Sequence, residues 1–105
     1  MIDPVKRVLN VGGNCKAIPL PEHFSGWEHI LLDIDRKDDV DIVCDARRLV
    51  DLEGNKFDAV YCSHNLEHYY LYDAHKVLAG FHHVLKPNGF AHIRVPDVVS
   101  NTPIV

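Results

Sequence analysis

The chain has 105 residues, of which 47% are hydrophobic and 25% charged, and its formal net charge is −4. This size and balance fit one globular domain over residues 1–105 and exclude a disordered chain. The sequence also lacks the clustered Lys and Arg of a nucleic-acid-coating surface, and no apolar stretch approaches the ~20 residues of a membrane span.

Five short apolar runs predict β-strands. They span residues 7–11, 29–33, 41–44, 57–62 and 90–95. Most of these runs are continuously apolar rather than alternating, which is typical of parallel strands covered on both faces. We therefore expect an α/β fold with a doubly wound, mostly parallel sheet of about five strands.

One long helix is predicted before the fifth strand, over residues 71–85. Its apolar residues recur at steps of three and four and form one stripe, made of Leu71, Ala74, Leu78, Phe81 and Leu85. Residues 86–89, with the sequence Lys-Pro-Asn-Gly, predict a turn into the last strand.

The first half of the chain is predicted to be poor in helix. Pro19 and Pro21 interrupt the link between the first two strands, where we expect a loop with one helical turn near Glu22. Residues 46–54 have room for one or two further turns. The fold is therefore expected to be abbreviated, and the tail at residues 98–105 carries no recognisable element.

The glycine pair Gly12-Gly13 follows the first strand and precedes Asn14. Glycines at such a point let backbone N–H groups come close to a ligand, because no Cβ blocks the approach. The same pair is equally typical of a tight turn. The dinucleotide fingerprint needs a third glycine and a following helix, so the pattern favours a ligand without phosphates over NAD.

Acidic residues end the second and third predicted strands. Asp33 lies about 20 residues beyond the glycines, where a carboxylate accepts hydrogen bonds from ribose hydroxyls. Asp35 follows closely, and we prefer Asp33 because it ends the apolar run; a solvated acidic loop is the alternative. Asp45, before Ala46, suits the amino group of adenine or the cap of a short helix, and these two roles are compatible.

The fourth strand leads into Ser63 and a histidine-rich segment. His64, Glu67 and His68 match the H-x-x-E-H pattern of a zinc site. That motif needs a further ligand downstream and a long helical scaffold, for which little chain remains, so we favour a ligand-binding loop without metal.

Cys15, Cys44 and Cys62 are widely spaced and odd in number. Together with the lack of a signal peptide at residues 1–8, they predict a cytoplasmic protein with buried, reduced thiols.

Together these segments resemble a class I S-adenosylmethionine (SAM)-dependent methyltransferase of the small type 11 kind, over residues 6–97. Residues 57–68, F-D-A-V-Y-C-S-H-N-L-E-H, look like the family's F-D-x-V-x-x-x-x-x-L-E-H segment. Residues 83–89, H-V-L-K-P-N-G, resemble its R-V-L-K-P-G-G turn. The glycine segment departs from the family, because Asn10 stands where an acid is usual and Gly-Gly-Asn replaces G-x-G.

The resemblance implies a Rossmann-like fold, SAM as cofactor, and methyl transfer to an acceptor that it does not identify. It implies a SAM site made of Gly12, Gly13 and Asn14 at the methionine part, Asp33 and Asp35 at the ribose, Asp45 and Ala46 at adenine, and Ser63 and His64 at the sulfonium. His64 would also be the catalytic base if the acceptor needs one.

The family's sheet normally continues with an antiparallel hairpin, which this sequence does not show. A truncated or non-catalytic cofactor-binding module is therefore the alternative function. A fifth strand without this hairpin would lie at the sheet edge, so we expect self-association of the chain through residues 90–95.

Overall fold

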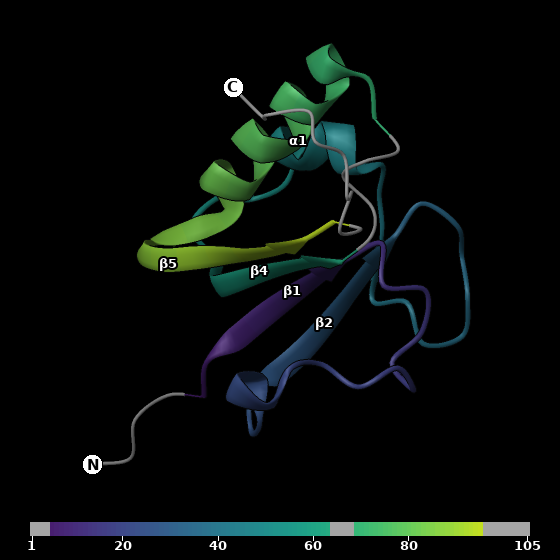
Figure 1. The fold of residues 1–105 in the computed structure, drawn as a ribbon, viewed down its shortest axis with the longest axis vertical. Helices are drawn as coiled ribbons and strands as arrows, with labels where there is room; N and C mark the ends of the chain where they lie inside the picture. Colours follow the sequence, from purple (N-terminus) through teal and green to yellow (C-terminus); the bar gives the residue numbers. More distant parts are fainter. Residues whose placement is uncertain (1–4, 64–68, 96–105) are drawn as a thin grey trace, which may run out of the picture.

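Five parallel strands form one sheet, in the order β3-β2-β1-β4-β5, in the computed structural model, which describes residues 5–63 and 69–95 (Figure 1). The strands are β1 (Arg7–Val11), β2 (Glu28–Asp33), β3 (Ile42–Val43), β4 (Phe57–Ser63) and β5 (Leu85–Arg94). The helix α1 (Leu71–Val84) and the 3₁₀ segments η1 (Glu22–Phe24) and η2 (Ala46–Asp51) lie between them. The doubly wound α/β fold expected from the sequence is confirmed, because the chain winds outward from β1 to β3 and then from β4 to β5.

β1 is the central strand of the sheet, with two strands on each side of it. Leu9 lies opposite Ile30 of β2 on one side and opposite Val60 of β4 on the other. Leu9 and Val60 are fully buried. Strands paired and covered in this way need apolar residues at consecutive positions, which explains the continuous apolar runs in the sequence.

The two faces of the sheet are covered by different elements. Figure 1 shows α1 and η2 above the sheet and η1, in dark blue, below it. The larger core lies between the sheet and the layer made of α1 and η2. It packs Leu9 and Val60 of the sheet against Leu49 of η2 and Phe81 of α1. On the other face, Phe24 of η1 packs against a smaller cluster of strand residues, made of Val8, Ala59 and Tyr61. Successive strand residues such as Val8 and Leu9 thus belong to opposite cores.

The turn predicted at residues 86–89 is wrong, because α1 runs directly into β5 and these residues belong to the strand. Phe57 pairs with Leu85, and Ala59 pairs with Phe90, so a single residue of β4 faces four residues of β5. The Lys-Pro-Asn-Gly segment is therefore a bulge inside the strand. A proline and a glycine fit there because the hydrogen-bond ladder is already interrupted.

No helix in the described part of the chain combines the length and apolarity needed to cross a membrane. The tail at residues 98–105, for which the sequence predicted no element, lies outside the described residues.

Candidate functional site

Two cavities lie at the carboxyl ends of the strands and share Gly12. The first has a volume of about 180 Å³, and we call it the Asp45 cavity; its walls include Val11, Leu32, Asp33, Ala46 and Arg47. The second has a volume of about 320 Å³, and we call it the Asn10 cavity; its walls include Gly13, Asn14, Leu20, Tyr61 and Ser63. Seven of the nine cofactor-binding residues predicted from the sequence line these two cavities: Gly12, Gly13, Asn14, Asp33, Asp45, Ala46 and Ser63.

The turn after β1 needs both of its glycines. Gly12 has a φ of +71°, in the left-handed region that favours glycine, and its N–H donates to the carbonyl of Leu32 at 2.8 Å. That N–H therefore extends the pairing of β1 with β2 and does not face a ligand. A Cβ on Gly13 would overlap the side-chain amide of Asn10. Asn14 also has a positive φ, of +70°, which asparagine tolerates better than most residues.

Asn10 carries an unsatisfied acceptor in the wall of its cavity. The residue is 3% exposed, and its Nδ2 lies 3.1 Å from Nε2 of His29. Burial and the nearby Lys16 ammonium lower the pKa of His29, so the ring is neutral near pH 7, and its Nδ1–H tautomer accepts this hydrogen bond from Asn10. Asn10 Oδ1 has no hydrogen-bond partner among the described residues. A buried acceptor without a partner is costly, so this atom is suited to receive a donor from a ligand.

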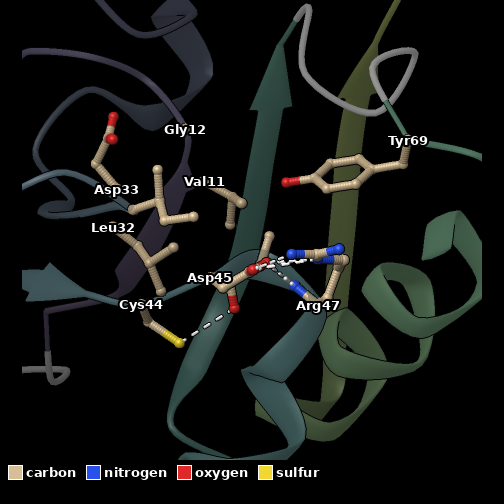
Figure 2. A pocket seen from close by; sticks show the side chains of 10 residues that line it. Val11, Gly12, Leu32, Asp33, Cys44, Asp45, Arg47 and Tyr69 are labelled. Carbon is tan, nitrogen blue, oxygen red and sulfur yellow. Dashed lines mark hydrogen bonds and ion pairs between the residues drawn. The ribbon is translucent and has the colours of Figure 1, made fainter.

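Asp33 lies at the end of β2 with its carboxylate already held. The residue is 8% exposed, its Oδ1 accepts the backbone N–H of Asp35 at 3.0 Å, and Lys37 Nζ lies 3.8 Å from its Oδ2. Figure 2 shows Asp33 and Asp45 on either side of Leu32, so the two acids bracket the Asp45 cavity. Asp35 is exposed and is not among the residues that line either cavity.

Asp45 caps η2, as one of its two predicted roles requires, and it is also paired with Arg47. Its Oδ1 accepts the backbone N–H of Arg47 at 2.9 Å, and Arg47 Nη2 lies 2.6 Å from its Oδ2. Hydrogen bonds from Arg47 lower the pKa of Asp45, and the same pair raises the pKa of Arg47. The remaining guanidinium nitrogen, Nη1, lies 3.6 Å from Asp73 of α1. The acid expected at adenine is therefore engaged by a neighbouring cation (Figure 2).

Two side chains with strong hydrogen-bonding groups in the wall of the Asp45 cavity were not anticipated from the sequence. Arg47 is one, and Tyr69 is the other; in Figure 2 the Tyr69 hydroxyl points toward Val11 across the Asp45 cavity. The sequence does carry a signal for Arg47, since an arginine two residues after a capping aspartate can fold back onto that carboxylate. Tyr69 is adjacent to the histidine-rich segment and carried no such signal.

The remaining predictions concern the candidate base, the metal motif and the cysteines. His64, the candidate base, and the H-x-x-E-H segment lie outside the described residues. Within residues 5–63 and 69–95, no group of three or more His, Cys, Asp or Glu is placed to hold a metal ion. None of the three cysteines forms a disulfide within the described residues; the predicted burial is correct for Cys62, whereas Cys15 and Cys44 are half-buried.

Both the sequence and the fold of the chain are similar to those of methyltransferases. The model of a methyltransferase domain family matches residues 11–93. The chain is also similar to the crystal structure of a SAM-dependent methyltransferase from Archaeoglobus fulgidus, with a TM-score of 0.56 and 26% sequence identity. The similarity covers 78% of this chain and 41% of that chain, so this chain spans less than half the length of that protein. No curated protein matches the chain.

Proposed function

This chain belongs to the methyltransferase domain family, as its resemblance predicted, and from that premise we propose that its two cavities together bind SAM for methyl transfer. The observation that carries the proposal is that the cavities share Gly12 at the carboxyl edge of the sheet. Ligands of open parallel sheets bind at this edge, beside the point where the strand order reverses. Here that point lies between β1 and β4, whose ends supply Gly13 and Ser63 to the Asn10 cavity.

The residues present fit the parts of SAM. The orphaned Oδ1 of Asn10 suits the ammonium group of the methionine part, and the absence of a Cβ on Gly13 leaves room for the Asn10 amide itself. The carboxylates of Asp33 and Asp45 suit the ribose hydroxyls and the adenine amino group. Both acids line a cavity whose arginine is already paired with carboxylates, which favours a nucleoside over a phosphate-bearing ligand.

Bound SAM would supply a methyl group on a positively charged sulfur, which is already activated toward nucleophiles. The protein's residues then have to hold the cofactor and orient the acceptor. The family resemblance assigns Ser63 and His64 to the sulfonium end, and His64 to proton removal when the acceptor needs it. Ser63, at the end of β4 in the wall of the Asn10 cavity, is consistent with this assignment.

The test is titration calorimetry of the full chain with SAM and with S-adenosylhomocysteine. We expect both to bind, and we expect Asp33→Asn to weaken binding by about tenfold or more, because an amide cannot accept from two hydroxyls as a carboxylate does. Asp38→Asn is the matched control, since Asp38 is exposed in the same loop and lines neither cavity. Absence of heat with both ligands, or equal weakening in the two variants, would contradict the proposed site.

A second candidate function is a module that binds the cofactor without turnover. It is favoured by Asn10, whose neutral amide stands where the family usually carries an acid. The calorimetric experiment separates the two when it is followed by assays for methyl transfer. Binding without transfer to any offered acceptor supports the module, whereas S-adenosylhomocysteine formed in proportion to an acceptor supports the enzyme.

A further inference from the structure

We propose that Arg47 is a specificity-determining residue of the Asp45 cavity, which leaves Asp45 for Asp73 when an adenine ring binds. The proposal rests on the proposed function, because it assumes that Asp45 receives the adenine amino group. It adds that Arg47 competes with adenine for Asp45, and that Asp73 receives the displaced Arg47 side chain.

The first step is that Arg47 donates to both carboxylate oxygens of Asp45 and takes up most of its acceptor capacity. A carboxylate offers about four lone-pair sites. Oδ1 accepts the backbone N–H of Arg47 at 2.9 Å, Oδ2 accepts Nη2 at 2.6 Å, and the single hydrogen of Nε is shared between the two oxygens, each 3.1 Å away. Only the backbone contact belongs to the cap of η2. An amino group that approaches Asp45 must therefore displace the side chain of Arg47 and leave the cap intact.

The second step is that the displaced guanidinium has a partner within reach. Arg47 Nη1 already lies 3.6 Å from Oδ2 of Asp73, in the first turn of α1. The Arg47 side chain is 46% exposed, so solvent leaves it room to rotate, and Asp73 is 24% exposed. Figure 2 shows the guanidinium between the Asp45 carboxylate and α1. Its charge thus stays paired with a carboxylate in both positions, which keeps the exchange inexpensive.

The third step concerns which purines the cavity accepts. Adenine presents an amino donor, which matches the freed Asp45 carboxylate. Hypoxanthine presents a carbonyl at the same position, which the carboxylate repels and the Arg47 guanidinium attracts. With Arg47 present, the cavity offers either an acceptor or a donor. Without Arg47 it offers only the acceptor and discriminates more strongly in favour of adenine.

The experiment is calorimetric titration of the full chain with S-adenosylhomocysteine and S-inosylhomocysteine. We expect Arg47→Ala to bind the adenosyl ligand about three- to tenfold more tightly than the unsubstituted chain, and to bind the inosyl ligand more weakly. Arg48→Ala is the matched control, because Arg48 lies next in η2, carries the same charge and pairs with Asp51 instead. Circular dichroism and thermal melting establish that each variant is folded, and Arg47→Lys, which keeps the charge but loses the fork, should bind with intermediate affinity.

Asp73→Asn tests the second position of the arginine. We expect it to weaken binding of S-adenosylhomocysteine in the unsubstituted chain, where the displaced guanidinium loses its partner, and to have no such effect in Arg47→Ala. Equal affinities of Arg47→Ala and the unsubstituted chain, or equal gains in Arg47→Ala and Arg48→Ala, would overturn the inference and leave the proposed function standing. Absence of binding in every variant, Arg47→Ala included, would overturn both.

Discussion

At the scale of single residues, a pair of histidines joins η1 to β5. Nδ1 of His92 lies 3.2 Å from Nε2 of His23, and the two rings stack with their centroids 5.0 Å apart. One ring must donate and the other accept in this contact. Burial, and then the charges of His23 and Arg94, lower the pKa of His92.

This lowered pKa predicts a loss of stability in mild acid. Since His92 has an ordinary pKa when the chain is unfolded, the unfolded chain binds more protons than the folded chain in the window below about pH 6.5. The free energy of unfolding should therefore fall between about pH 7.5 and pH 5. His92→Gln should show a smaller fall in urea denaturation, because glutamine does not titrate. His75→Gln, at an exposed position of α1, should keep the fall seen in the unsubstituted chain; an unchanged fall in His92→Gln would refute this origin.

At the same scale, the residues that end strands could be recognised from the sequence, and their contacts could not. The positions of Asp33, Asp45 and Ser63 follow from the parallel sheet, which brings its carboxyl ends to one edge. The spacing of Asp45 and Arg47 permits their pairing, but whether the pair forms depends on the side-chain rotamer of Arg47 and on Asp73, which comes from a helix beyond β4. Periodicity carries no information on such contacts.

At the scale of elements, the position of η2 is set by its close approach to α1. A Cβ on Gly80 of α1 would lie 2.5 Å from Cβ of Leu49 in η2, and Leu49 is fully buried. Asp45 and Arg47 lie at the start of η2. The contact between α1 and η2 therefore helps to position one wall of the Asp45 cavity.

Gly80→Ala should therefore destabilise the protein, although alanine is the better helix former. The overlap with Leu49 should cost about 1–3 kcal/mol, which exceeds the gain of about 1 kcal/mol in helix propensity. Urea denaturation measures the net change. Ala79→Gly, at the exposed neighbouring position, calibrates the propensity effect in the same helix. A more stable Gly80→Ala protein would show that α1 and η2 can separate freely.

The sequence predicted most elements from their apolar patterns, but the stripe predicted for α1 is only partly correct. Leu71 and Leu78 are exposed, and the buried face of the helix is made of Val77, Gly80, Phe81 and Val84. α1 was expected at residues 71–85 and spans Leu71–Val84, and β1 has the predicted bounds Arg7–Val11. β5 was predicted too short, because its Lys-Pro-Asn-Gly segment has the composition of a turn. That segment stays in the strand as a bulge opposite a single residue of β4, and such long-range pairing leaves no local pattern.

At the scale of the whole molecule, β5 is an edge of the described sheet. It is the longest strand, with ten residues, and it pairs with β4 along one side. Ala91 is exposed on it, and so is Phe90. An edge strand of this length offers backbone groups that a second copy of the chain can pair with.

We therefore expect the chain to self-associate through β5, with a mass that rises with concentration in light scattering. Ala91→Lys should reduce the association, because a charge on an edge strand opposes strand pairing. Ala79→Lys makes the same substitution at an exposed position of α1 and should leave the association unchanged. A monomeric mass at every concentration, or equal effects of the two lysines, would contradict this interface.

The position of β1 also governs the order in which the molecule can fold. β1 finds its first partner, β2, nearby in the chain, but the backbone N–H of Arg7 at its start donates to Asp58, 51 residues later. Closing so long a loop is slow, because its entropy is lost before the contacts form. During synthesis the first strands emerge well before β4, so a nascent chain carries one open edge of β1 until Phe57–Ser63 leaves the ribosome. The sheet, and the Asn10 cavity that spans β1 and β4, can therefore form only after β4 has been synthesised.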